Sequence, residues 1–155
     1  MRSARRSPTT RPAALSEIGT PLAVGEIASY HAHIYYEAAE RPRAEHLRKL
    51  IGERFLLRIG SWHDHPVGPH TKGMYQLAFA VAEFPRLVPW LMLNRDGLSI
   101  LVHPNTLRPR DDHLVHALWL GDPLPLKEEP LPVQLSARAE IEELPPANTA
   151  PTIAP

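Results

Sequence analysis

Two histidines separated by a single residue are the clearest candidates for chemistry in this sequence. His31 and His33 lie in the aromatic and β-branched run 30–36, and a strand there would direct both imidazoles to one face, because strand side chains alternate. The chain has nine histidines and no cysteine, so any metal site must use nitrogen and oxygen ligands. Three neutral imidazoles with open coordination positions would suit a catalytic metal ion. From spacing alone, metal binding and ordinary buried histidines are about equally good interpretations.

His70 and His103 are two further candidates, because each is expected to lie next to the end of a strand. His70 comes directly after Gly68-Pro69 in a polar loop, and His103 closes an aliphatic run. The other histidines have plainer interpretations. We expect His63 and His65 to be solvated loop residues and His46 to be exposed on a helix. His113 and His116 follow Asp111-Asp112, which we expect to cap a short helix.

Other chemistries find little support. No serine lies in a Gly-x-Ser-x-Gly elbow, and no glycine-rich loop has the spacing and Lys-Ser/Thr ending that bind phosphate. Seventeen Lys and Arg balance seventeen Asp and Glu, so no overall field attracts nucleic acid or an anionic membrane. Tyr35 and Tyr75 could stack on RNA bases, but no basic surround supports this. Without an apolar span or secretory signal, we expect a soluble cytoplasmic protein that binds neither nucleic acid nor membrane.

The elements that would position the histidines follow from hydrophobic periodicity. Strand and helix patterns alternate in the order strand, helix, strand, strand, helix, strand. This is the ferredoxin-like α+β plan, an antiparallel four-stranded sheet with both helices on one face. The expected strands are residues 27–36, 55–59, 74–81 and 98–103, and the expected helices are residues 42–51 and 85–94.

In that plan the first strand lies between the third and the fourth. His103 would therefore emerge beside His31 and His33, on the sheet face that the helices leave open. The loop before the third strand could bring His70 into the same concavity. The topology thus predicts that four imidazoles converge.

Both ends of the chain differ in composition from the middle. Residues 1–22 are rich in arginine and are expected to be a disordered leader; a transit peptide is the alternative, although Pro8 and Pro12 would break its helix. Residues 23–127 form the expected domain. Residues 128–155 are a proline-rich extension, with one peripheral helix expected over 133–144 and a loose tail after it.

Four separated motifs, taken in order, resemble the DOPA 4,5-dioxygenase family. The similarity spans about residues 28–126. Two stretches depart from the family pattern. The family usually has a proline after Gly-Pro-His, where this chain has Thr71-Lys72. The stretch between Thr106 and Asp111 is shorter and more basic than the family pattern. Both would lie near a substrate, so the resemblance specifies the natural substrate less closely than the fold. The motifs are YHAHIYY at 30–36, GPH at 68–70 with MYQ at 74–76, VHPNT at 102–106, and DH at 112–113 with ALWLG at 117–121.

The resemblance implies a small dimeric enzyme that opens a catechol ring beside its two hydroxyls with non-haem Fe(II) and O₂. With DOPA, the product would be a muconic semialdehyde-type compound, seco-DOPA. Zinc or another divalent ion could occupy the site in a purified sample. The resemblance implies His33, His70 and His103 as metal ligands, His31 as acid/base or alternate ligand, Tyr75 as an orienting donor and His113 in a supporting position.

Several alternatives stay open at this point. His31 and His33 could exchange roles, and Glu37 could complete a two-histidine, one-carboxylate site. The protein could also bind a metal or ligand without cleaving rings, or serve as a non-catalytic dimerising domain. A carboxylate on the substrate would need a cation, for which the candidates are Arg58, Lys72, Arg108 and Arg110.

Overall fold

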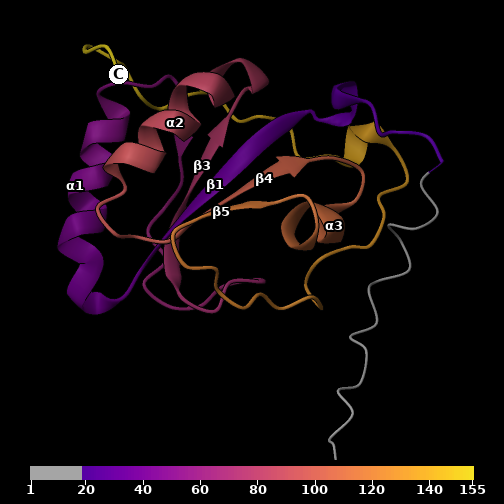
Figure 1. Ribbon diagram of the computed structural model, residues 1–155, viewed down its shortest axis with the longest axis horizontal. Helices are drawn as coiled ribbons and strands as arrows, with labels where there is room; N and C mark the ends of the chain where they lie inside the picture. Colours follow the sequence, from indigo (N-terminus) through magenta and orange to yellow (C-terminus); the bar gives the residue numbers. More distant parts are fainter. Residues whose placement is uncertain (1–18) are drawn as a thin grey trace, which may run out of the picture.

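The computed structural model describes residues 19–155, so most of the predicted leader, residues 1–22, lies outside the described residues. The described part of the chain contains three α-helices and five strands (Figure 1). Short 3-10 turns precede or join them at Val24–Glu26, Ala38–Glu40, Val81–Glu83 and Arg138–Glu140. In chain order the elements are β1 (Ser29–Tyr36), α1 (Arg41–Gly52), β2 (Arg58–Ile59), β3 (Gly73–Phe79), α2 (Phe84–Asn94), β4 (Ile100–Asn105), α3 (Pro109–Leu114) and β5 (Leu118–Leu120).

The strands form one antiparallel sheet in the order β2-β3-β1-β4-β5. The predicted α+β class and the antiparallel sheet are therefore confirmed, and β1 lies between β3 and β4 as expected. The predicted number of four strands is wrong, because β5 pairs with β4 from Ile100 to Val102. A strand of three residues is too short to give a period-two signal in the sequence.

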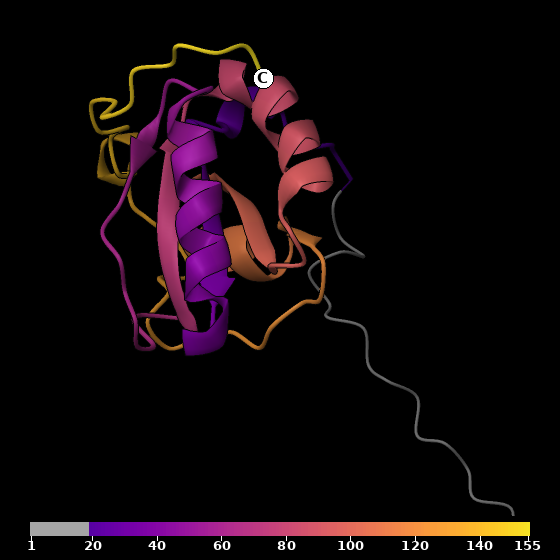
Figure 2. The same cartoon turned by 90° about the vertical axis from the view of Figure 1, so that its left-hand side faces the viewer.

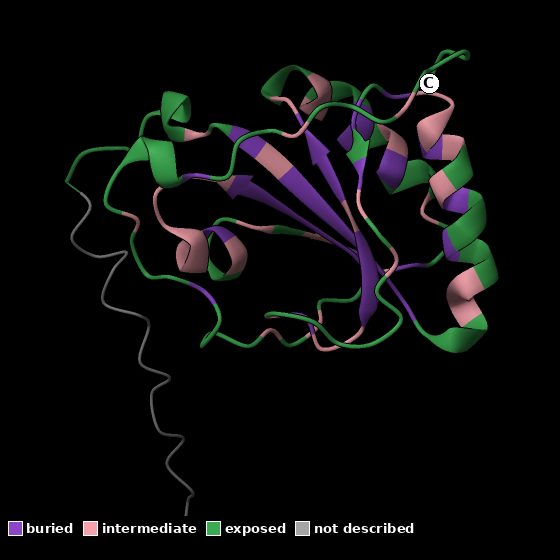
Figure 3. Ribbon diagram, turned by 180° about the vertical axis from the view of Figure 1, so that it is seen from behind, coloured by how far each residue is buried: buried purple, intermediate pink, exposed green. Residues whose placement is uncertain are grey.

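One face of the sheet carries the hydrophobic core. Ala32 and Ile34 of β1 and Ile100 and Val102 of β4 are fully or almost fully buried there, with the apolar side chains of α1 and α2 packed against them. Figure 2 shows the two helices side by side, and Figure 3 shows that the strands are mostly buried while the outward faces of the helices are exposed. The opposite face is left for the histidines.

Prolines start both long helices. Pro42 and Pro85 occupy the first turns of α1 and α2, where an amide N–H would have no partner within the helix. In the 3-10 turn before α1, Glu37 and Glu40 form a reciprocal capping box. These signals explain why the two helices begin within one residue of their predicted starts.

The fourth strand runs past the proline that was expected to end it. Tyr35 donates its backbone N–H to the Ser99 carbonyl at 3.0 Å, so residues 99, 101, 103 and 105 direct their polar groups toward β1. Pro104 therefore faces the opposite side, where pairing with β5 has already ended at Val102. A missing N–H costs nothing at such an edge.

The C-terminal extension has no α-helix, so the helix predicted over 133–144 is wrong. Only the 3-10 turn at Arg138–Glu140 forms there. The tail is also not loose: Asn148 binds both backbone groups of Ile59 through its side-chain amide, at 2.8 Å each, and Thr149 bonds to Leu57. The tail thereby covers the outer edge of β2, whose strand is limited to two residues instead of the predicted five.

No helix within residues 19–155 has the length and apolar character needed to cross a bilayer.

Candidate metal centre

Five histidines gather on the sheet face opposite the helices and line one cavity of about 310 Å³. β1 supplies His31 and His33, and β4 supplies His103, which lies directly across from His31 in the ladder. His70 enters from the loop before β3, and His113 comes from α3. The side chains of His31, His33, His70 and His103 are all buried, with exposed fractions of 8%, 2%, 4% and 1%. The structure thus brings together the four imidazoles that were expected to converge and His113, which was expected in a supporting position.

Three of these histidines lie close enough to share one ion. His31, His33 and His103 each offer a ring nitrogen, and these atoms lie within 4.8 Å of one another. The Nε2 atoms of His33 and His103 are 3.1 Å apart. Nitrogens bound at about 2.0–2.1 Å to one ion lie roughly 3–4 Å apart, so small ring rotations would complete the geometry. The three residues could bind a metal.

His70 has a different environment from the one expected of a ligand. Its Nδ1 lies 2.7 Å from the hydroxyl of Tyr35, and its ring centroid is 4.1 Å from that of His33. It is not among the three histidines that meet the distance requirement. The group that meets it contains His31, named above as the alternate ligand, together with His33 and His103.

Backbone carbonyls fix the tautomers of two rings. His103 Nδ1 lies 2.8 Å from the Pro104 carbonyl, and His113 Nδ1 lies 2.7 Å from the Pro109 carbonyl. A carbonyl only accepts, so each Nδ1 must carry the proton and each Nε2 must present a lone pair. This pattern, with the far nitrogen held by a carbonyl, is typical of metal-binding histidines.

His33 supplies a further test of whether a cation fits. Its Nδ1 is buried and has no hydrogen-bond partner within residues 19–155, and its Nε2 contacts only another imidazole nitrogen. Leaving a buried polar atom unpaired costs about 1–3 kcal/mol. An all-nitrogen donor set that is incompletely satisfied by the protein fits a borderline divalent ion better than it fits a closed hydrogen-bond network.

Burial keeps the cluster uncharged. It lowers the pKa of His31 and of His70 to about 4, with repulsion from His113 adding to the effect. Burial also lowers the pKa values of His33 and His103 well below the usual histidine range, and that of His113 to a smaller extent. At neutral pH all five rings are therefore neutral, which is the form that binds metals.

Tyr75 does not reach the site, so its prediction as an orienting donor is wrong. Its hydroxyl donates to the Ala44 carbonyl at 2.8 Å on the helix-covered face. The reason is strand parity: Tyr75 pairs with Ile34, whereas the next residue, Gln76, pairs with His33 and faces the cavity.

Tyr35 and Gln76 are the polar residues that the sequence analysis missed as parts of the site. The Tyr35 hydroxyl contacts His70, and burial raises its pKa, so it remains a protonated donor. The Gln76 amide lies 3.5 Å from His31 Nε2. Strand parity could have found both, because Tyr35 alternates with His33 and Gln76 faces it across the ladder.

Asp112 holds α3 against the end of β4. Its carboxylate, 1% exposed, accepts the Thr106 backbone N–H at 2.8 Å and the Thr106 hydroxyl at 2.7 Å. Asp111 and Asp112 lie inside the helix and do not cap it as expected. The contact instead fixes the neighbouring His113, whose ring centroid is 3.8 Å from that of His103.

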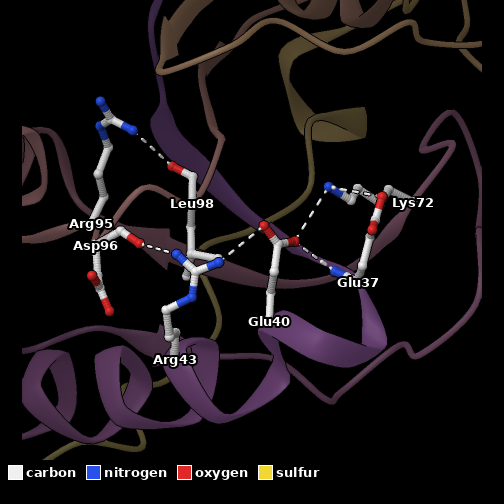
Figure 4. Close-up of polar contacts among 7 residues, drawn as sticks. All are labelled: Glu37, Glu40, Arg43, Lys72, Arg95, Asp96 and Leu98. Atoms are coloured by element: carbon white, nitrogen blue, oxygen red, sulfur yellow. Dashed lines mark hydrogen bonds and ion pairs between the residues drawn. The ribbon is translucent and has the colours of Figure 1, made fainter.

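The candidate carboxylate ligand lies elsewhere. Glu37 pairs with Lys72 at 3.6 Å in a partly exposed network that also contains Glu40 (Figure 4). Glu37 and Lys72 are both absent from the residues that line the histidine cavity. The two-histidine, one-carboxylate alternative with Glu37 is therefore wrong for this arrangement.

The remaining candidates from the sequence also lie outside the cavity. His46, His63, His65 and His116 are exposed, as expected for the first three. Arg58 is exposed on β2, and Arg110 donates to the Leu131 carbonyl. Arg108 lines a neighbouring hollow with Glu26 and Arg138. None of the four predicted cations lines the histidine cavity.

The chain is similar in sequence to two fungal proteins. The chain is 36% identical over 118 residues to an uncharacterized 21.2 kDa protein of Botryotinia fuckeliana, covering 68% of this chain and 64% of the relative. It is 33% identical over 118 residues to the DOPA 4,5-dioxygenase of Amanita muscaria, covering 70% of this chain and 52% of that enzyme. The chain thus spans between about half and two thirds of the length of these curated relatives.

The chain also matches a solved structure and a protein-family model. The crystal structure of a protein from Nostoc punctiforme PCC 73102, provisionally assigned as a dioxygenase, matches with a TM-score of 0.70 and 51% identity. The match covers 71% of this chain and 96% of that one. The model of the Dopa 4,5-dioxygenase family matches residues 30–130, and the chain belongs to this family.

Proposed function

We propose that this protein is an extradiol dioxygenase that opens the ring of a catechol, such as DOPA, with Fe(II) and O₂. The observation that carries the proposal is the buried group of His31, His33 and His103 within a member of this family. When bound, a ferrous ion would supply Lewis acidity and open positions for a catechol and for O₂. His31, His33 and His103 would hold it, each as a neutral imidazole.

His113 can then accept a proton from the substrate, and His70 can donate a hydrogen bond to it. His113 presents an Nε2 lone pair, because its Nδ1 proton is committed to the Pro109 carbonyl, and this lone pair can accept a proton from a catechol hydroxyl. If the Tyr35 hydroxyl donates to His70 Nδ1, the proton of His70 lies on Nε2. His70 would then donate a hydrogen bond to a substrate oxygen, and Tyr35 would hold it in that tautomer.

The dimensions of the cavity favour a small aromatic substrate. Its volume of about 310 Å³ lies at the lower end of the range for small-molecule sites. Burial of the histidines excludes bulk water, which strengthens the electrostatic interactions inside. With DOPA, extradiol cleavage would give a seco-DOPA semialdehyde.

The proposal also includes the fold type, the oligomeric state and the cellular location. The strand order agrees with a ferredoxin-like unit made of β1 to β4, extended by β5. The homodimer and the cytoplasmic location stay predictions from the sequence.

Anaerobic reconstitution with Fe(II) tests the proposed activity. Addition of a catechol and air should give a yellow semialdehyde chromophore together with O₂ uptake. A His103→Ala variant should lose both, while a His46→Ala variant, altered at an exposed histidine on α1, should keep them. Stoichiometric iron binding without colour across several catechols would refute ring cleavage and would point to a metal-binding protein without this activity.

A further inference from the structure

One wall of the histidine cavity comes from residues 131–142, which lie beyond the region matched by the family model. Leu131 and Ile141 in this wall are each only 7% exposed. Two backbone hydrogen bonds fasten it: Arg110 N–H donates to the Pro132 carbonyl at 3.0 Å, and Leu135 N–H donates to the Leu107 carbonyl at 2.7 Å. The wall is therefore a fixed part of the site, supplied by sequence outside the family pattern.

The same wall brings negative charge to the cavity. Glu140 and Glu142 both line it, and neither forms an ion pair within residues 19–155. Glu140 accepts one hydrogen bond, from the Ser136 backbone N–H at 3.2 Å. No arginine or lysine of the described chain is among the lining residues. Apart from the buried Asp112, whose carboxylate is bonded to Thr106, these two exposed glutamates are the acidic residues that line the cavity.

The nearest cations serve other contacts. The Arg110 guanidinium donates to the Leu131 carbonyl at 3.1 and 3.2 Å. Arg108 and Arg138 line the adjacent hollow, which shares only Thr106 with the histidine cavity. Neither guanidinium is among the groups that line the histidine cavity.

The glutamates share this cavity with the histidines that could hold a metal. The Nδ1 atom of His33 is buried and has no partner within the described chain, and His33 lines the same cavity. The exposed glutamates thus lie at the rim of a cavity whose buried lining contains the candidate metal-binding histidines.

We propose that Glu140 and Glu142 select a catechol whose side chain bears a protonated amine and no carboxylate. The inference rests on the proposed function for the catechol itself, and it deepens that function by assigning the side-chain charge. An ammonium would lie among unpaired carboxylates, whereas a carboxylate would be repelled by them. The expected order of affinity is amine first, then the zwitterion DOPA, then a catechol with only a carboxylate.

Binding to the full-length chain loaded anaerobically with Fe(II) tests this without turnover, because ring cleavage needs O₂. Calorimetric titration would compare 3,4-dihydroxyphenylethylamine with 3,4-dihydroxyphenylpropionate, two catechols of similar size and opposite charge. We expect about tenfold tighter binding of the amine at low salt, a preference that falls as salt is added. A Glu140→Gln/Glu142→Gln double variant should lose the preference. The matched control is Glu143→Gln, a neighbouring exposed glutamate outside the cavity lining, which should keep it.

The outcomes separate this inference from the proposed function. Equal binding of the two catechols, no binding of either, or a preference unchanged in the double variant would overturn it. Tighter binding of the carboxylate, lost in an Arg108→Gln variant, would also overturn it and would assign recognition to the adjacent hollow. Preferential binding of the amine without ring cleavage by the iron-loaded protein would support the inference while refuting the proposed activity.

Discussion

Acidification should destabilise the metal-free protein in a pH range set by its buried histidines. Burial lowers the pKa of His31 and of His70 from 6.5 to about 4. Because the folded-state values lie below the unfolded ones, the unfolded chain takes up protons first. Stability is therefore complete above about pH 6.5 and is lost as the pH falls toward about 4.

The size of the effect follows from these shifts. One pKa unit corresponds to about 1.36 kcal/mol, so a fall from pH 6.5 to 5 should cost about 2 kcal/mol for each of the two histidines, or about 4 kcal/mol together. His33 and His103 shift in the same direction and add to the loss. Asp112 opposes it, because burial raises the pKa of this carboxyl. The net loss is a large fraction of the 5–15 kcal/mol that stabilises a typical domain.

Urea unfolding followed by tryptophan fluorescence at pH 7.5, 6 and 5 measures this loss. The carboxylates with lowered pKa values, such as Glu40 and Asp64, lose their contributions only below about pH 4.5, so they do not interfere above pH 5. A His46→Ala variant should behave as the unchanged protein. A free energy of unfolding that stays constant from pH 7.5 to 5 would refute the view that the cluster is buried and neutral.

Three further predictions concern single side chains. His103→Ala should lower Fe(II) affinity at least about tenfold, measured by equilibrium dialysis with His46→Ala as the control; unchanged affinity would contradict the ligand assignment. Tyr35→Phe should reduce kcat roughly tenfold with little change in KM, whereas Tyr75→Phe should cost about 1–2 kcal/mol of stability and leave kcat intact; the reverse pattern would invalidate the placement of the two tyrosines. Asn148→Ala should lower the free energy of unfolding by about 1–3 kcal/mol in urea titration, because both backbone groups of an edge residue lose their partner; no change would mean that the tail does not protect the sheet edge.

Strand parity was the most informative signal in the sequence. It placed His31 and His33 on one face and brought His103 beside them, and the ladder has His31 opposite His103. The same rule excludes Tyr75 from that face and favours Tyr35. The prediction nevertheless named Tyr75, because this residue lies in one of the motifs that resemble the family. The location of the site was therefore predictable, while the choice between two tyrosines depended on applying parity consistently.

Contacts between distant segments could not be predicted from the sequence. The Tyr35–His70 hydrogen bond joins residues 35 positions apart, and Asn148 reaches Ile59 across 89 positions. The pattern of residues 133–144 predicted a helix, but the wall formed by residues 131–142 contains only one 3-10 turn and is held by individual backbone bonds. Its acidic character is visible in the sequence, but its position over the histidines is a property of the tertiary structure.

An anaerobic crystal structure of the Fe(II)-reconstituted protein, with the iron located by anomalous scattering, would test the metal centre directly. We expect one iron ion bound by ring nitrogens of His31, His33 and His103 at about 2.0–2.2 Å, with His70 and His113 facing the open coordination positions. Iron bound by His70 in place of His31, or iron located outside the histidine cavity, would contradict this expectation.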